Sequence, residues 1–556
     1  MSIITRLLTN PPSQFNLGWS LIAISILLLM IPNVCCSMYR VINSPFPGPK
    51  LAKFTQWWFR WHELRDGILN ATHRAHRNYG PIVQLSPKMV SFCHPDAIKD
   101  IYTGPRGGLD TTDLVWFFER YGSSNVVSTV DAELHLLRRK NVAGLYSSPA
   151  AASPAFQAHI RTTIDTFMNE IKVGASPGQP SSWTVDMFPM MRWLTADIMI
   201  GLTYGPERSL NLLTNSDSRA QMNELLTPTL ELVASPLAAV FQWLPLPIMK
   251  LLSPLLNQGP NLAKFGMILA QESLKALLPP QSNDDEGKAN THLQHLLRLF
   301  KKNGPSPAIP NINYIASDTL DHFSGGTTTT ADFLSALLYH LSLPENKHHQ
   351  DKLRQELQAF TSGTSPTAST EHIPLSQLQT LPYLNGILRE TLRISPPIPF
   401  SLPRLVKTKD QDVSVLGMKI DPGTIISIQP YTLHRDPETF PNPDVWEPER
   451  WQVPITSPAH RQMQRMLIPF GYGQRMCTGM SVAWAIMRQV TARIYLEYET
   501  SLDEGVWFEE ESVLASKGGI GIQERQRKKN NKKKKNNKKK NLFPDGNMQP
   551  IVFSRV

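Results

Sequence analysis

Cys477 lies in a glycine-rich segment that could hold a thiolate in a fixed position. Residues 469–479 read Pro-Phe-Gly-Tyr-Gly-Gln-Arg-Met-Cys-Thr-Gly, and an apolar run from Met480 to Tyr495 follows them. We expect this run to form a helix, whose free N–H groups and dipole favour negative charge on a cysteine just ahead of it. A buried structural cysteine in a tight turn is the alternative. It does not explain why phenylalanine, arginine and the glycines stand at fixed positions around the sulfur.

The spacing Phe-Gly-x-Gly-x-Arg-x-Cys-x-Gly resembles the haem-binding loop of the cytochrome P450 family. The resemblance implies that Cys477 ligates the iron of haem b (iron protoporphyrin IX) as a thiolate, whose electron donation favours O–O cleavage. It also implies that the residues around the sulfur bind the haem, namely Phe470, Gly471, Arg475 and Gly479.

Further basic residues match the family's contacts to the haem propionates. Residues 131–147 have helical character, and His135 and Arg139 are four residues apart, on one helical face. A solvated basic face is the alternative for this helix. Arg404 matches another propionate-binding arginine of the family, and the resemblance gives Arg475 the same role.

The segment Ile312–Leu343 contains two glycines followed by four threonines, a composition with poor helix propensity. It resembles the family's long helix across the distal haem face, which makes Thr329 the catalytic threonine that helps to deliver protons. The Thr329 hydroxyl would bond the Gly325 carbonyl and open the helix locally. The family's acidic residue before this threonine is Thr328 here, so Asp321, seven residues earlier, is the candidate to act instead through water.

Glu390, Arg393 and Arg450 are expected to form a buried structural triad. Residues 390–393 fit the family's Glu-x-x-Arg, a spacing that is common by chance in any helix. Arg450 belongs to a Pro-Glu-Arg-Trp segment like the one that completes the triad in the family. A buried carboxylate needs hydrogen-bonded partners, which two arginines supply. The triad would hold the chain that precedes the cysteine loop.

Two turns lie near the triad in the sequence. The proline-rich segment Ser395–Phe400 cannot be helical and, in the family, leads into a strand beside the haem. The segment His434-Arg435-Asp436-Pro437 fits a family turn that we expect to be structural.

The composition is that of a globular protein with a locally basic segment. The chain has 556 residues, 41% hydrophobic and 18% charged, and a net charge of +10. Residues 525–540 hold eleven positive charges, which leaves −1 for the other residues. The body of the protein therefore gives no support for nucleic-acid binding. Two of the four cysteines, Cys35 and Cys36, lie in the apolar N-terminal region, so we expect no disulfide framework and a reducing compartment.

The N-terminal region predicts a membrane anchor. Residues 17–38 carry no charge, and at ~1.5 Å per residue in a helix they would extend ~33 Å, enough to cross a bilayer. A cleaved signal peptide is the alternative, but its apolar region would be shorter and preceded by a more basic segment. Basic residues follow the span, so residues 1–16 are expected in the lumen of the endoplasmic reticulum and the rest in the cytosol. Residues 39–51, rich in proline, predict an extended hinge.

Residues 52–556 are expected to form one catalytic domain. The resemblance implies the haem-thiolate fold, mainly α with a smaller β subdomain. The expected first elements are helices at Trp57–Tyr79 and Ala97–Tyr102 and paired strands at Pro81–Leu85 and Met89–Cys93. The aromatic cluster Leu114–Phe118 either covers the substrate or belongs to the core, and residues 162–301 are helical in pattern.

Residues 525–541 form a run of lysine and asparagine within that domain. Runs of like charge are usually solvated and disordered, and a surface or nuclear-targeting role is the alternative. The tail after it, Phe543–Val556, resembles the family's closing strands, so the run interrupts a terminal β-region. Our hypothesis is a retained non-coding stretch, because lysine and asparagine codons are rich in adenine. Sequencing the transcript would test it.

These resemblances predict a monooxygenase that inserts one oxygen atom from O2 into an apolar secondary metabolite. The sequence is similar in style to fungal enzymes that oxidise terpenoids, polyketides or alkaloids. The implied partners are NADPH–cytochrome P450 reductase, cytochrome b5 as a second electron donor, a small apolar substrate and the membrane, with no nucleic acid. A haem-thiolate isomerase, dehydratase or peroxide-using enzyme without a reductase is one alternative. An inactive, membrane-tethered haem-binding protein is the other.

Overall fold

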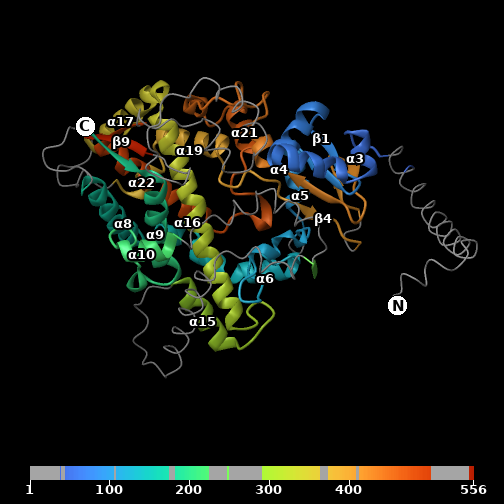
Figure 1. The fold of residues 1–556 in the computed structure, drawn as a ribbon, viewed down its shortest axis with the longest axis horizontal. Coiled ribbons are helices and arrows are strands. Elements are labelled where there is room, and N and C mark those ends of the chain that lie inside the picture. The colour runs from blue at the N-terminus through green and yellow to red at the C-terminus, as the bar shows by residue number, and fades with distance from the viewer. Residues whose placement is uncertain are drawn as a thin grey trace, which may run out of the picture.

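The long helix α16 (Ile312–Ser342) runs through the middle of the protein (Figure 1). The computed structural model describes residues 44–104, 108–173, 182–223, 291–362, 373–408, 412–502 and 550–555, together with Met38 and residues 247–248. Within these ranges no helix has the length and apolar character needed to span a membrane. Except for Met38, the expected anchor lies outside the described residues, and so does the run 525–541.

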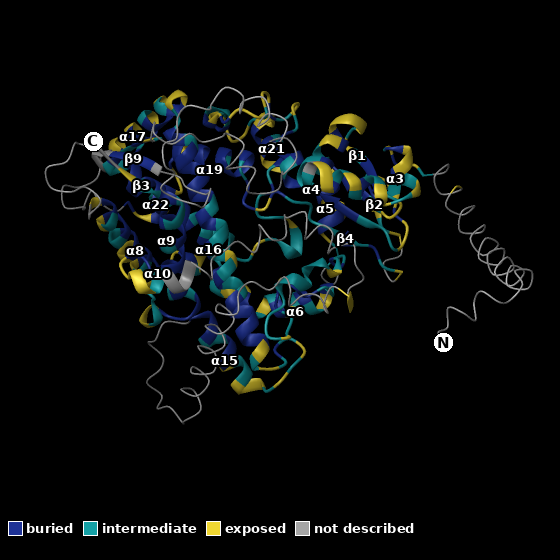
Figure 2. Cartoon of the chain, viewed as in Figure 1, coloured by how far each residue is buried: buried dark blue, intermediate teal, exposed yellow. Residues whose placement is uncertain are grey.

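The main hydrophobic core surrounds α16. The helix begins after Asn311, whose side chain accepts the Tyr314 N–H and caps the first turn. It packs against α9 (Met187–Thr203), α19 (Pro382–Ile394) and α22 (Met480–Glu497), and Figure 2 shows the buried residues along these helices. Burial of this length of apolar surface explains why α16 forms in spite of its run of threonines.

The other helices enclose this core and the sheets. They are α3 (Lys50–Phe54), α4 (Trp57–Tyr79), α5 (Pro95–Tyr102), η2 (Asp113–Phe118), α6 (Ala132–Val142), η3 (Ala143–Tyr146), α7 (Ser148–Ala151), α8 (Pro154–Val173), η4 (Pro206–Arg208), α10 (Ser216–Asn223), α15 (His292–Asn303), η7 (Pro344–Asn346), α17 (Lys347–Ser362), α18 (Leu375–Leu378), α20 (Pro430–Leu433), η8 (Pro448–Gln452), α21 (Pro458–Met466) and η9 (Gly473–Arg475).

Two small sheets lie at opposite ends of the protein (Figure 1). The first has the order β1-β2-β7-β4, in which β2 pairs in parallel with β7 and the other pairs are antiparallel. The second has the order β3-β9-β8, all antiparallel, and joins strands from three distant parts of the chain. The strands are β1 (Ile82–Ser86), β2 (Met89–Phe92), β3 (Ser182–Asp186), β4 (Arg404–Leu405), β7 (Ile425–Ile428), β8 (Tyr498–Leu502), β9 (Pro550–Arg555) and the separate hairpin of β5 (Ser414–Val415) with β6 (Met418–Lys419).

The predicted fold class is confirmed: the protein is mainly α with small sheets, and α4, α5 and the β1–β2 pair lie where the sequence places them. One local expectation is wrong, and one of two open alternatives is excluded. β3 interrupts the region 162–301 that was expected to be helical, because it pairs with β9 far along the chain. The segment Leu114–Phe118 is not core, since none of the residues of η2 is buried.

Candidate active site

The cysteine loop joins α21 to α22 and is fixed by its own backbone. The Cys477 N–H donates to the Phe470 carbonyl at 2.8 Å, and the Met476 N–H donates to the Gly473 carbonyl at 3.1 Å. Gly471 and Gly473 have φ angles of 71° and 70°, which glycine adopts without strain. A Cβ atom on Gly473 would lie 1.9 Å from the Tyr102 carbonyl oxygen, so the loop can pack against α5 only with glycine there.

Cys477 is an exposed residue at the end of this loop. The surrounding protein still desolvates it and thereby raises the pKa of the thiol, while the Gly479 N–H and the charge of Arg139 act in the opposite direction. The Gly479 N–H at the start of α22 favours the thiolate as expected, but desolvation outweighs this effect. A metal ion on the sulfur would displace the thiol proton.

Arg139 on α6 contacts the loop itself. Its Nη1 donates to the Met476 carbonyl at 2.5 Å and to Thr478 Oγ1 at 3.0 Å, on either side of the cysteine. In the structure, this arginine fixes the loop. The propionate role that the sequence gave it stays a prediction.

Three other basic side chains gather beside the loop with few anionic partners. Arg475 donates from Nη1 to the Thr129 carbonyl and from Nη2 to the Val130 carbonyl, each at 2.7 Å. Arg404 donates to the Pro403 carbonyl at 2.9 Å, and its guanidinium lies over the Tyr102 ring, 4.8 Å from the centroid. Tyr102 is a supporting residue that sequence reasoning missed, since nothing in its local sequence marks it.

His135 is the third of these side chains. It is buried, so the alternative of a solvated basic face on α6 is wrong for this residue. Burial and, to a smaller extent, the charges of Arg475, Arg139, Arg404 and Arg138 together lower its pKa to about 3. These shifts show that the arginines lie close enough to the imidazole to act on its charge.

The basic cluster fits a group with two carboxylates. Among the described residues, His135 Nδ1 and Arg475 Nε are buried without a hydrogen-bond partner. Burial and the charge of Arg404 lower the pKa of Arg475 to about 10, although Asp110 and Asp131 oppose this. Buried donors and unbalanced positive charge are costly unless an anion binds to them. The propionates of a haem whose iron lies on Cys477 would supply that anion.

α16 presents an open side at Gly325. This residue is exposed in the middle of a largely buried helix, and a Cβ atom there would meet no atom within 4 Å. A Cβ on the next residue, Gly326, would lie 2.4 Å from Met199. The open space is therefore on the side of Gly325, where a ligand can approach the backbone.

The predicted hydrogen bond of Thr329 is present. Its Oγ1 donates to the Gly325 carbonyl at 2.5 Å, and Thr328 Oγ1 donates in the same way to Ser324 at 2.9 Å. The expected local opening is not found, because α16 is one uninterrupted α-helix. A threonine hydroxyl can share a carbonyl with the helical N–H, so the bond does not require an opening.

Asp321 is the residue that we expect to act in place of the acid that the family has at the position of Thr328. Burial raises the pKa of its carboxyl to about 7, with the charges of His322, Asp318 and Arg120 acting on it as well. At ~1.5 Å per residue it lies ~10 Å along the helix axis from Thr328. A proton could pass between the two positions only through several water molecules.

The residues of the expected triad are in contact. Glu390 receives two bonds from Arg393, at 2.7 and 3.0 Å, and one from Arg450 Nε at 2.9 Å. The Trp451 indole and the Glu447 N–H also donate to it, at 2.9 and 3.0 Å. Burial raises the pKa of Glu390, but the arginines outweigh this and hold it below its usual range.

Arg393 continues the network toward the cysteine loop. It donates to the carbonyls of His434, Pro443 and Val445, at 3.0, 2.6 and 2.9 Å. The His434 ring in turn accepts the Ile468 N–H at 2.9 Å, just before the loop begins. The predicted structural turn at residue 434 thus connects the triad with the loop.

Comparison with known proteins agrees with this geometry. The family model of cytochrome P450 matches residues 47–523. The chain is 27% identical to the cytochrome P450 monooxygenase traB of Penicillium crustosum, over 82% of this chain and 86% of that protein. It is 25% identical to the tryptophan 6-hydroxylase fscE of Fusarium equiseti, over 88% and 93%. It is 26% identical to the monooxygenase cpaH of Aspergillus oryzae, over 90% and 93%.

The chain belongs to the cytochrome P450 family and is a monooxygenase of that family. Membership implies a haem cofactor. The accessible cysteine and the basic cluster beside it are what such a cofactor requires of the chain.

Proposed function

We propose that this protein is a haem b monooxygenase that oxidises an apolar secondary metabolite with electrons from NADPH through a reductase. The observation that carries the proposal is the exposed Cys477 beside the buried, unbalanced basic cluster of His135, Arg404 and Arg475. The relatives are fungal cytochrome P450 monooxygenases, which supports a biosynthetic role.

The chain's own residues have separate tasks in this proposal. Cys477 provides the thiolate ligand, and the basic cluster holds the propionates. When bound, the haem supplies the activation of O2 and the transfer of one oxygen atom. Thr329 holds a hydroxyl at the open side of α16, where it can donate and accept a proton.

The substrate, membrane and partners complete the proposal. The substrate is an apolar terpenoid, polyketide or alkaloid, which an apolar site would bind by excluding water. Residues 17–38 anchor the protein in the endoplasmic reticulum membrane with the catalytic domain in the cytosol. A flavoprotein reductase, with cytochrome b5 as a second donor, binds the face of the cysteine loop.

Thr328 favours a second candidate function. Because it replaces an acid and Asp321 lies about two turns away, proton delivery differs from the family pattern. An isomerase, a dehydratase or a peroxide-using enzyme would need neither this delivery of protons nor a reductase. Product formed with NADPH and reductase, with peroxide, and with neither distinguishes these reactions.

The first experiment is the carbon monoxide difference spectrum of the reduced membrane fraction, for the wild type and Cys477→Ala. We expect a thiolate-type Soret band in the wild type and its loss in the variant. Cys93→Ala is the matched control and should keep the band, because Cys93 packs with the core of the first sheet. A wild-type protein without haem, or a variant that keeps the thiolate band, would contradict the assignment.

A further inference from the structure

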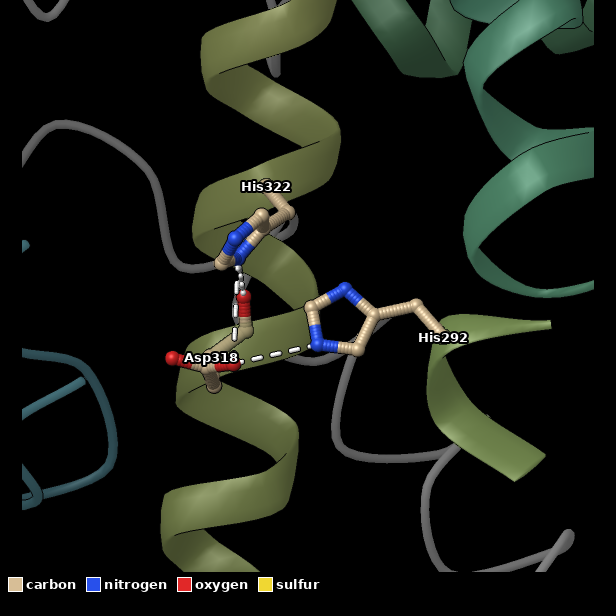
Figure 3. Close-up of side chains that lie close together, drawn as sticks. All are labelled: His292, Asp318 and His322. Atoms are coloured by element: carbon tan, nitrogen blue, oxygen red, sulfur yellow. Dashed lines mark hydrogen bonds and ion pairs between the residues drawn. The ribbon is translucent and has the colours of Figure 1, made fainter. Parts of the chain in front are cut away.

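Three side chains of the kinds that bind metal ions meet inside the protein (Figure 3). His292 is the first residue of α15, while Asp318 and His322 lie one turn apart on α16. Sequence reasoning missed this group, although the spacing of Asp318 and His322 by four residues places them on one helical face. Figure 3 shows the His292 imidazole directed at the carboxylate of Asp318, and the His322 imidazole directed at both the backbone carbonyl and the carboxylate of that residue.

The distances are those of a compact ligand set. His292 Nε2 lies 3.1 Å from Asp318 Oδ2, and His322 Nδ1 lies 3.7 Å from the same oxygen. One ligand atom from each residue lies within 4.8 Å of the other two. Zinc binds nitrogen and oxygen at about 2.0–2.2 Å in a tetrahedron, which separates neighbouring ligand atoms by about 3.3–3.5 Å. Small side-chain rotations would therefore bring all three residues onto one ion.

Contacts behind the ligands already orient two of them. Tyr146 OH lies 2.8 Å from His292 Nδ1, the nitrogen that faces away from the carboxylate. The Val126 N–H donates to Asp318 Oδ1 at 2.8 Å, which leaves Oδ2 directed at the imidazoles. Hydrogen bonds of this kind, which fix the imidazole ring and leave one carboxylate oxygen free, are typical of residues that bind a metal ion.

The protons can be rearranged without charging either histidine. Without metal, His292 Nε2–H donates to the carboxylate and its Nδ1 accepts the Tyr146 hydroxyl. With metal, Nε2 binds the ion and Nδ1–H donates to the Tyr146 oxygen instead. His322 Nδ1 now lies 2.9 Å from the Asp318 carbonyl, so it must give up this bond and carry its proton on Nε2.

We propose that His292, Asp318 and His322 bind one zinc ion, with water as the fourth ligand, and that the ion ties the start of α15 to α16. Two imidazoles and one carboxylate suit zinc, which has no redox chemistry of its own. The three side chains are buried or nearly so, with exposed fractions of 0%, 0% and 9%. None of the three residues belongs to the cysteine loop or to the basic cluster beside it, and the ion would stabilise the fold.

The test uses the full-length, haem-loaded protein without a histidine tag. Zinc and iron are measured by mass spectrometry after dialysis against micromolar zinc and then against zinc-free buffer. We expect about one zinc per iron, and zinc X-ray absorption with nitrogen and oxygen ligands at about 2.0–2.1 Å. Asp318→Asn and His322→Gln should each lower the zinc content more than about tenfold.

A matched control comes from the other group of this kind among the described residues, His348, His349 and Glu449. The double variant His348→Gln, His349→Gln should keep its zinc. The carbon monoxide spectrum of every variant shows separately whether the fold and the haem site are intact. Wild-type protein with haem but without zinc, sulfur ligands in the absorption spectrum, or loss of zinc only in the control variant would overturn the proposal. The wild-type measurements decide this even where a variant fails to fold.

Discussion

The side chains around Cys477 differ in what already satisfies them. Arg139 bonds the loop on both sides of the cysteine, whereas His135 Nδ1 and Arg475 Nε have no partner among the described residues. A site that is complete except for an anion is arranged in advance for its cofactor. At the scale of single residues, the loss of one hydroxyl group or the addition of one methyl group is therefore expected to change what the site can do.

Thr329→Ala should reduce product formation while leaving haem binding intact. The change removes the hydroxyl at the open side of α16, and a positioned proton donor contributes about 100-fold or more to a rate. Because water can replace the hydroxyl in part, we expect the product formed per NADPH to fall about tenfold. Thr328→Ala is the matched control, because its hydroxyl makes the same kind of bond one residue earlier. Equal losses in the two variants would show that Thr329 has no special role.

Gly473→Ala should prevent the cysteine loop from packing against α5. Its φ is 70°, and the added Cβ would lie 1.9 Å from the Tyr102 carbonyl oxygen. Gly304→Ala is the control, with a φ of 69° but no atom within 4 Å of the Cβ. The control should lose only about 1–2 kcal/mol through left-handed strain. Haem content after purification checks both, and normal haem content in Gly473→Ala would contradict the packing argument.

At the scale of elements, α19 and η8 are joined through one buried carboxylate. Glu390 on α19 bonds Arg450 and the Trp451 indole, both on η8, and Arg393 bonds the carbonyls that lead to the loop. Glu390 and Arg450 are 60 residues apart in the sequence, so their ion pair, and not a short stretch of chain, holds η8 against α19. The network reaches the chain before the cysteine loop through the His434 carbonyl and the Ile468 N–H.

Glu390→Gln should destabilise the protein strongly. It leaves the buried Arg393 without its anion, while Arg450 keeps its pair with Glu447, and breaking a buried pair costs about 3–5 kcal/mol of unfolding free energy. Urea unfolding followed by tryptophan fluorescence measures this. Lys352→Ala removes the more exposed pair with Glu449 and should cost less than about 1 kcal/mol. Similar losses in the two variants would show that the buried network contributes no more than a surface pair.

At the scale of the whole molecule, several histidines are buried in the neutral form. Burial lowers the pKa of His76 and His340 to about 4 and that of His434 to about 3. The same residues in the unfolded chain have a pKa near 6.5. Between these values the unfolded chain binds more protons than the folded protein, so acid favours unfolding.

We therefore expect stability to fall as the pH drops from about 6.5 toward 4. Each such histidine contributes up to about 1.4 kcal/mol per pH unit. Asp321 acts in the opposite direction: its folded pKa of about 7 gives stability at low pH that is lost as the pH rises. Three histidines outweigh one aspartate. Urea midpoints between pH 7.5 and 5 measure the slope, and His340→Gln should make it shallower. A flat profile would mean that these histidines are not buried as described.

Much of the site could be predicted from the sequence because its signals are local. The glycine spacing around Cys477, the four-residue spacing of His135 and Arg139, and the Glu390–Arg393 pair are each set within a few residues. Glycine spacing limits the backbone angles of a loop, and helical spacing fixes which side chains share a face. These facts hold before any long-range contact forms.

The remainder depends on contacts between distant segments. β3 exists because β9 pairs with it, and the zinc ligands meet because α15 packs on α16. Desolvation of Cys477, which raises the pKa of its thiol, likewise depends on the protein packed around the loop. By itself, the sequence determined the chemistry of the cysteine loop and the class of fold. Only the tertiary structure decided which buried groups lack a partner and which donors hold the loop, because burial and charge depend on neighbours that the local sequence does not name.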